Sequence, residues 1–466
     1  MYNKKNKIAF VSMAIWAFGV VGCKKDIDDV PAPLPLVPVT TVTTPSPNAL
    51  KDSMLFYSRD IYLWNDQLPV NFSTANFDGP EALMQGIRPY SLESGTSTPA
   101  DRWSFAIKKE EWDKMSAGLN LLVQDNHAVV GDFGFQVFFR AEGDLRVRMV
   151  EPNSPAAVAG LRRGWRVLGI NGNNNMTPNN AAFIIKSLYE SASSDLDLQK
   201  PDGSTVKMQI NADSYKKDPV YLDTVYMAGG KKVGYLVFTS FLGDEPKVAN
   251  QLRQAIASFT AQGVEELIVD LRYNGGGYVV LQQKFADLLV PSSADGSIMM
   301  KQQFNNNNSQ RNTITNFHKA GALNLSRIYF IVGSATASAS ELLINNLKPY
   351  MDVRLIGPGN THGKPVGYFP IPVGKEWYIF PASFRTLNSR GEGNYFKGLT
   401  VNGQVADGLD ADWGDINESC LASALRNIRI GQYKSQTLAA QQLPSTQVIE
   451  GNKALELPFL KLTIDR

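Results

Sequence analysis

Two apolar runs, each followed at once by small residues, most constrain what this chain can fold into. Leu267–Leu271 precedes Arg-Tyr-Asn-Gly-Gly-Gly, and Ile328–Val332 precedes Gly-Ser-Ala-Thr-Ala-Ser. Short apolar runs bounded by glycine are typical of buried strands, and residues 246–262, just before the first run, have helical spacing. Because strands alternate with helices here, the sequence predicts an α/β (α+β multidomain) fold with a mixed sheet flanked by helices.

The length of the chain indicates more than one core, since 466 residues exceed what a single domain usually holds. We expect an N-terminal helical region over 48–117, where apolar residues recur at helical spacing. A β-rich module over 118–213 and an α/β domain over 218–430 follow. No pattern assigns the C-terminal tail, 431–466. Within the α/β domain, the polar run Gln302–Asn316 is expected to form an exposed loop.

The first 22 residues are predicted to be a signal peptide. Three lysines precede an uncharged apolar stretch of 15 residues, Ile8–Gly22, which is too short for a typical membrane span. Cys23 follows, and this junction resembles a bacterial lipobox, which implies lipidation of Cys23 and a membrane anchor. An ordinary signal peptide with a chance cysteine is the alternative.

Residues 23–47, rich in proline and threonine, are expected to be an extended tether. The predicted location is the cell envelope, as an outer-membrane lipoprotein facing the periplasm or the surface.

The composition argues against several classes of protein. With 46 basic and 44 acidic residues, the net charge is +2, which gives no reason to expect nucleic-acid binding. The chain has only three histidines and two cysteines, which disfavours a zinc site or a disulfide framework. We therefore expect no metal and no cofactor.

The β-rich module resembles a PDZ domain. Leu145–Val150 alternates as a strand does, and Ser154–Gly172 reads as a short helix opening at Ser-Pro-Ala, a Gly-Leu stop and a strand ending in Asn-Gly. The resemblance implies that a peptide adds as a strand, with Gly134 and Phe135 in the loop that holds its terminal carboxylate. The alternative is a module that only gates or stabilises an enzyme.

Three loops carry the residues that suggest chemistry. The glycine run after Leu267–Leu271 frees backbone N–H groups for a ligand, but no Lys-Ser/Thr pair follows it as a phosphate-binding P-loop requires. Ser338 opens a predicted helix, where it either acts as a nucleophile or caps the helix together with Glu341. Lys364 lies among glycines after the apolar strand Val353–Ile356.

Together and in this order, these loops resemble those of the C-terminal processing peptidases, the tail-specific serine protease family. That family carries Asp-Leu-Arg-x-Asn-x-Gly-Gly, then Ser-Ala-Ser-Glu, then a lysine about 25 residues later. The resemblance covers roughly residues 100–430. It implies an endopeptidase that cleaves envelope or exported polypeptides, with Ser338 as nucleophile and Lys364 as base. It also implies an oxyanion hole made by the amides of Gly276 and Ala339.

The lysine in such a dyad acts as a base only if its surroundings favour the neutral form of its amine. A serine hydroxyl is a weak nucleophile, and lysine accepts its proton only when neutral, so we expect burial to favour neutral Lys364. The family usually places a glutamine four residues past this lysine, whereas this chain has Tyr368. A tyrosine hydroxyl can bond an amine, which makes Tyr368 a possible third member. Asn360, Thr361 and His362 are the alternative candidates.

Two other functions stay open at this point. One is a catalytically silent lipoprotein that binds peptides through the PDZ-like module. The other is an esterase or acyl transferase that uses the same dyad, because a fold does not fix its substrate. The presence of both Ser338 and Lys364 favours catalysis over the first, and the PDZ-like module favours a polypeptide substrate over the second. The sequence gives no indication of the oligomeric state.

Overall fold

The computed structural model of the chain describes residues 48–116 and 132–433, apart from 216 and 410, together with most of 447–455. The predicted signal peptide, Cys23 and the tether lie outside these residues. Within the described ranges, no helix combines the length and apolar character needed to cross a bilayer.

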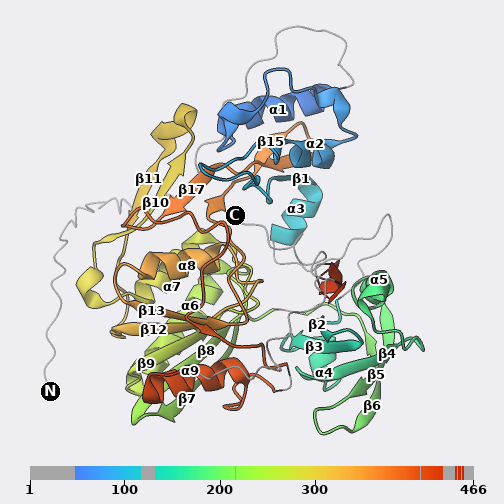
Figure 1. Cartoon of the computed structure of the whole chain (residues 1–466), viewed down its shortest axis with the longest axis vertical. Coiled ribbons are helices and arrows are strands. Elements are labelled where there is room, and N and C mark those ends of the chain that lie inside the picture. The colour runs from blue at the N-terminus through green and yellow to red at the C-terminus, as the bar shows by residue number, and fades with distance from the viewer. Residues whose placement is uncertain are drawn as a thin grey trace, which may run out of the picture. The chain divides into compact units, whose positions relative to one another are not determined.

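A six-stranded mixed sheet forms the centre of the α/β part (Figure 1). Its first two strands form an antiparallel hairpin, and the other neighbours run parallel. This architecture confirms the predicted fold class. In spatial order, the strands are β18 (Gly403–Gln404), β13 (Asp352–Gly357), β12 (Arg327–Ile331), β9 (Glu266–Asp270), β8 (Lys231–Phe238) and β7 (Val220–Ala228).

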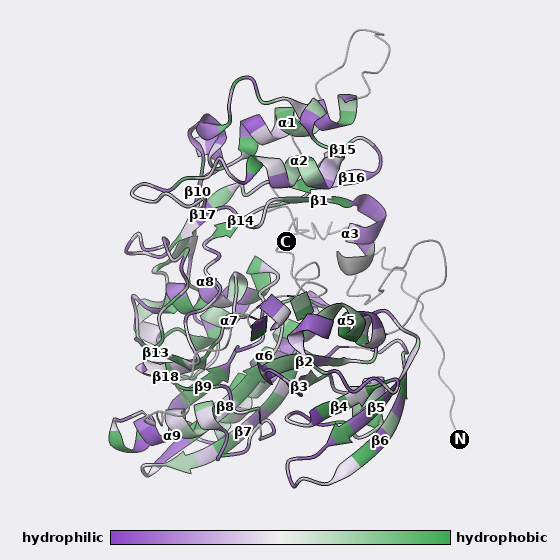
Figure 2. Ribbon diagram, turned by 45° about the vertical axis from the view of Figure 1, so that its right-hand side comes forward, coloured by the Kyte–Doolittle hydropathy of each residue, from purple (hydrophilic) through white to green (hydrophobic). Residues whose placement is uncertain are grey.

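Helices cover both faces of this sheet because successive strand residues point to opposite sides. Leu267 and Val269 pack with α6, α7 and α8, whereas Ile268 packs with α9. Figure 2 shows the hydrophobic colour along β8 and β9 between these layers. Asp244 caps the start of α6, because its carboxylate accepts the N–H of Lys247 at 3.0 Å. The helices are α6 (Glu245–Ala261), α7 (Val279–Leu289), α8 (Ala339–Leu347) and α9 (Ser419–Ile430).

The β-rich module is a five-stranded antiparallel sheet with two helices, and it has its own core. The Ser154 hydroxyl accepts the N–H of Ala157 and so caps α4. Val448 and Leu455, from the unassigned tail, are buried in this core. The elements are β2 (Phe135–Ala141), β3 (Asp144–Val150), α4 (Pro155–Val158), β4 (Arg166–Ile170), η3 (Pro178–Asn180), α5 (Ala181–Tyr189), β5 (Ser193–Gln199) and β6 (Thr205–Asn211).

The N-terminal region contains helices, as expected, but it also contains a strand that pairs with residues far along the chain. Phe105 lies opposite Phe380 in the β1–β16 pair. A single apolar core joins the first two helices to residues 366–384, so this region is completed by the α/β segment. The elements are α1 (Ala49–Ile61), η1 (Asn65–Gln67), η2 (Thr74–Asn76), α2 (Pro80–Ile87), β1 (Phe105–Lys108), α3 (Lys109–Ser116), β15 (Ile371–Val373) and β16 (Trp377–Phe380).

The polar run Gln302–Asn316 is not an exposed loop, and this expectation was wrong. It forms most of a hairpin in a second sheet of order β11-β10-β17-β14. Buried Asn305 and Asn308 donate to the carbonyl of Asp60, and Asn305 also donates to that of Tyr62. The end of α1 leaves such carbonyls without helical partners, which explains why asparagines are buried here. The elements are β10 (Ile298–Phe304), η4 (Ser292–Ala294), η5 (Asn306–Arg311), β11 (Thr313–Asn316), β14 (Val366–Gly367) and β17 (Phe384–Leu387).

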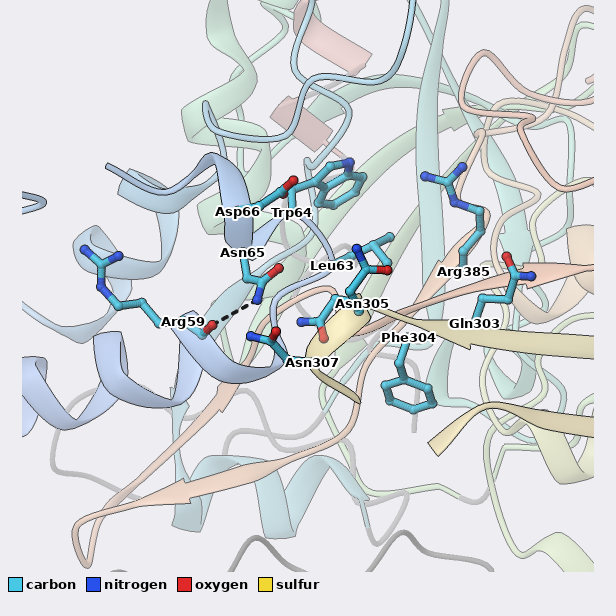
Figure 3. Close-up of a pocket in the computed structure, with 11 residues that line it drawn as sticks. Arg59, Leu63, Trp64, Asn65, Asp66, Gln303, Phe304, Asn305, Asn307 and Arg385 are labelled. Atoms are coloured by element: carbon cyan, nitrogen blue, oxygen red, sulfur yellow. Dashed lines mark hydrogen bonds between the residues drawn. The ribbon is translucent and has the colours of Figure 1, made fainter. Parts of the chain in front are cut away.

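A polar cavity lies beside these asparagines, between the end of α1 and the β10–β17 pair (Figure 3). Arg59, Asn65 and Asn307 lie on one side of it, and Arg385 and Gln303 lie on the other. The Asn65 side chain donates to the carbonyl of Arg59 at 3.2 Å. None of the residues predicted to carry chemistry lines this cavity.

Candidate active site

The topology of the central sheet brings the three predicted loops together. The loops follow β9, β12 and β13, which are parallel neighbours, so all three leave the sheet at its carboxyl edge. Ligand sites of open α/β sheets commonly lie at this edge. Ser338 and Lys364 line the same small cavity there.

Ser338 is held in a conformation that few residues other than glycine adopt. Its φ is 56° and its ψ is −115°, immediately before α8 begins at Ala339. The preceding residue, Ala337, is fixed by its N–H, which donates to the carbonyl of Asn274 at 3.1 Å. Ser338 is only 8% exposed. Strained backbone of this kind persists where the surrounding structure enforces it, and such residues cluster at active sites.

Gly276 lies directly against the turn that carries the serine. Its φ is 103°, and a Cβ on it would lie 2.9 Å from both the Ala339 nitrogen and the Ser338 Cβ. Only glycine fits at this position. The N–H of Gly276, however, donates to the side chain of Asn274 at 2.9 Å. Ala339, as the first residue of α8, has an N–H with no acceptor within the helix. The structure therefore brings both predicted amides to the serine, but it engages one of them elsewhere.

Lys364 is buried, with 5% of its surface exposed, and its amine contacts the aromatic side chain of Tyr368. Its Nζ donates to the Tyr368 hydroxyl at 2.7 Å and lies 4.1 Å from the centroid of the same ring. The position four residues past the lysine therefore does contact the amine. Asn360 and Thr361 point elsewhere, since Asn360 donates to the Lys397 carbonyl and Thr361 to Glu341.

His362 is also oriented away from the lysine amine. Its Nε2 accepts from the Trp103 indole at 3.3 Å, and its Nδ1 lies 3.3 Å from the Ser334 carbonyl oxygen. Burial, and after it the charges of Arg102 and Lys364, lower the pKa of His362 to about 4. His362 is therefore neutral at neutral pH.

Glu341 links the serine to the lysine, a role that its position in a capping box did not reveal. One carboxylate oxygen accepts the N–H of Ser338 at 3.0 Å and the N–H of Lys364 at 2.8 Å. The other accepts the N–H of Gly363 at 2.6 Å and the hydroxyl of Thr361. Burial raises the pKa of Glu341, and these four hydrogen bonds oppose that rise. The carboxylate thus fixes the two loops relative to each other.

A buried charge cluster supports the glycine loop from behind. The Arg272 guanidinium is bonded to the carboxylates of Asp270, Asp407 and Glu418 at distances of 2.7–3.1 Å. Arg163, from the β-rich module, also donates to Asp407 at 2.6 Å. Burial alone would raise the pKa of Asp407, but the two arginines hold it well below its usual value. Charged groups from three chain segments therefore fix the loop after β9 and join it to the β-rich module.

The predicted peptide-binding residues of the β-rich module lie at the start of β2. Gly134 has a φ of 78°, and a Cβ there would lie 2.0 Å from the Ser154 Cβ, so glycine is required. Its N–H donates to the Asp132 carboxylate at 2.8 Å. The Phe135 side chain is buried in the core of the module. Peptide contact through Gly134 and Phe135 stays a prediction.

Comparison with known proteins gives the family that two parts of the chain resemble. Residues 232–403 match the model of Peptidase family S41, and residues 52–105 match that of the Peptidase S41 N-terminal domain. The two matches flank the β-rich module in order along the chain. These two parts of the chain are therefore similar to the two domains of peptidase family S41.

Among curated proteins, the carboxy-terminal processing protease CtpB of Bacillus subtilis (strain 168) is 24% identical over 333 residues, 68% of this chain and 62% of CtpB. CtpA of the same strain is 26% identical over 235 residues, 48% of this chain and 45% of CtpA. The matched segments thus span about half to three fifths of these relatives. A solved S41 protein from Bacteroides fragilis NCTC 9343 has a TM-score of 0.65 at 24% identity, covering 81% of this chain and 96% of that one. This likeness supports the fold.

Proposed function

We propose that this chain is a serine endopeptidase in which Ser338 is the nucleophile and Lys364 the general base. The observation that carries the proposal is the cavity that the strained Ser338 and the buried Lys364 line together. Glu341 holds the backbone of both residues, and the Tyr368 hydroxyl orients the lysine amine. A nucleophile, a base and a group that orients the base are the parts that covalent acyl transfer needs.

The reaction would proceed in two acyl-transfer steps. The Ser338 oxygen adds to the carbonyl carbon of the scissile bond while its proton passes to neutral Lys364. The negative oxygen of the tetrahedral intermediate lies near the Ala339 N–H, with Gly276 as the second donor once its N–H leaves Asn274. Lys364 returns the proton to the leaving amine, and the acyl-enzyme forms. Water then attacks the ester, again with Lys364 as base, and frees the acid and Ser338.

The cavity beside the dyad favours a small apolar side chain in the substrate. Burying such a side chain stabilises the bound substrate by about 1–2 kcal/mol. A charged side chain would lose its hydration there without a partner of opposite charge. Besides Ser338, Lys364 and Tyr368, the residues that line the cavity include Val279, Leu342, Val366, Phe384 and Tyr395.

Peptidase activity is tested directly with the purified protein. We expect it to react covalently with a fluorophosphonate probe and to digest denatured casein into peptides. Mass spectrometry of the digest then reports the residues on either side of each cut, which we expect to include small apolar ones. A protein that binds casein but neither reacts with the probe nor cuts it would contradict the proposed activity.

We also propose that the β-rich module is a PDZ-like domain that captures polypeptides for the active site. β2 is an edge strand of the five-stranded sheet and lies beside α5, and strand addition of a peptide requires such an edge strand. Arg163 of this module bonds both Asp407 and Tyr273 of the peptidase domain, which supports a module fixed close to the glycine loop.

Membrane attachment through a lipid on Cys23 completes the proposal. The basic start, the short apolar stretch and the cysteine after it support this. A Cys23→Ala variant is expected to move from the membrane fraction to the soluble fraction, measured by immunoblotting of fractionated cells. Stable anchoring needs more than one acyl chain, and in this proposal Cys23 carries all of them. Replacing Cys23 therefore removes the whole anchor and should release most of the protein. A variant that stays in washed membranes would rule out this anchor.

A further inference from the structure

β2 is an edge strand, and some of its hydrogen-bonding groups face away from β3. An edge strand presents such N–H and C=O groups to any extended chain that adds to it. In this protein, the groups at several positions are bonded within the chain. The N–H of Val137 donates to the hydroxyl of Tyr189, at the end of α5, at 3.1 Å. Near the start of the strand, the N–H of Gly134 is bonded to Asp132.

The far end of the same edge is bonded by a residue more than 300 positions away. The Asn452 side chain accepts the N–H of Phe139 at 2.7 Å and donates to its carbonyl at 2.9 Å. A side-chain amide has the same donor and acceptor as a backbone peptide group. Asn452 therefore pairs with Phe139 as a residue of an added strand would.

Apolar contacts hold the segment that carries this asparagine. Its described residues between 447 and 455 are helical, and this short red helix lies beside β2 in Figure 1. Val448 and Leu455 are 3% and 2% exposed in the core of the module. A Cβ on Gly451 would lie 2.6 Å from Pro178 and 3.2 Å from Phe139, so the helix backbone sits directly on the module.

We propose that residues 447–455 are an internal ligand of the PDZ-like module and close the β2 edge to polypeptides. An extended polypeptide can pair with Phe139 only after Asn452 has left it. The segment and the polypeptide thus compete for the same backbone groups, and the apparent affinity for polypeptide is reduced by the fraction of molecules that are closed. The inference rests on the proposed capture of polypeptides by this module.

The test measures binding of fluorescein-labelled, denatured casein by fluorescence anisotropy, in a Ser338→Ala background so that the probe stays intact. Asn452→Ala removes both hydrogen bonds to Phe139 and weakens the closed form. We expect this variant to bind casein about 10-fold more tightly. Asn211→Ala, which changes an exposed asparagine on β6 of the same module, is the matched control and is expected to bind as its parent does.

Hydrogen exchange of the parent protein gives a second readout. It needs no substitution at Asn452, so misfolding of that variant cannot affect it. Amides of residues 447–455 are expected to exchange faster when casein is added, because the segment is displaced. If casein binds while these amides keep their exchange rates, and Asn452→Ala binds no more tightly, the segment is a fixed part of the module and the inference is wrong. If neither protein binds casein, capture by the module fails as well. Cleavage that depends on Ser338 would still stand in either case.

Discussion

Replacing Ser338 with alanine is expected to abolish casein hydrolysis while leaving the fold intact. The change removes one oxygen, and without the nucleophile no acyl-enzyme forms, so the rate should fall by roughly 10⁴-fold or more. The backbone bond from residue 338 to Glu341 remains available, because it uses the N–H and not the hydroxyl. Hydrolysis of a fluorescent casein, together with the thermal unfolding midpoint, separates loss of chemistry from loss of structure.

Ser334→Ala is the matched control for this variant. Ser334 lies in the same loop, is exposed and is expected to be dispensable, since its contact to His362 uses its backbone carbonyl. If Ser338→Ala cleaves casein at the wild-type rate, the nucleophile lies elsewhere. Ser340, whose hydroxyl donates to the Asn274 carbonyl, would then be the next candidate.

The sequence indicated where the proposed dyad lies because its signals are local. A buried strand followed by small residues predicts a loop at the end of that strand, and parallel neighbours place such loops at one edge. Ser338 and Lys364 could be paired only through resemblance to a family, since no local pattern reports that β12 and β13 are adjacent. In the structure, β12 and β13 are paired, with Ile331 opposite Ile356, and this pairing brings the two loops together.

The residues whose roles were missed act through partners that are distant in the sequence. The spacing of Glu341 from Ser338 predicted a helix cap, and that bond exists. Its other partners, Gly363 and Lys364, lie on the next loop, and nothing in the sequence marks them. Asn452 is a stronger case, because it bonds Phe139 across 313 positions. Asparagine is common in exposed loops, so its type alone gives no sign of burial.

The second large effect is expected at Lys364. Arginine keeps the positive charge and much of the length of lysine, but in proteins it is effectively never deprotonated. If Lys364 accepts the serine proton, Lys364→Arg should lose activity to about the level of Ser338→Ala, measured in the same casein assay. Lys348→Arg, at the end of α8, is a control for the exchange itself and is expected to stay active. Thermal unfolding of both variants shows whether the larger guanidinium fits the buried position.

The pH dependence of the wild-type enzyme distinguishes Lys364 from His362 as the base. Activity should rise as the pH is raised, because loss of a proton from the lysine amine creates the base. The pKa of His362 is lowered to about 4, so this histidine is already neutral above that pH and cannot produce an alkaline limb. His362→Asn should therefore keep the limb. Substantial activity in Lys364→Arg, together with loss of the limb in His362→Asn, would assign the base to the histidine. If Lys364 only lines the cavity, Lys364→Arg should stay active, and its pH–activity profile should match that of the wild type.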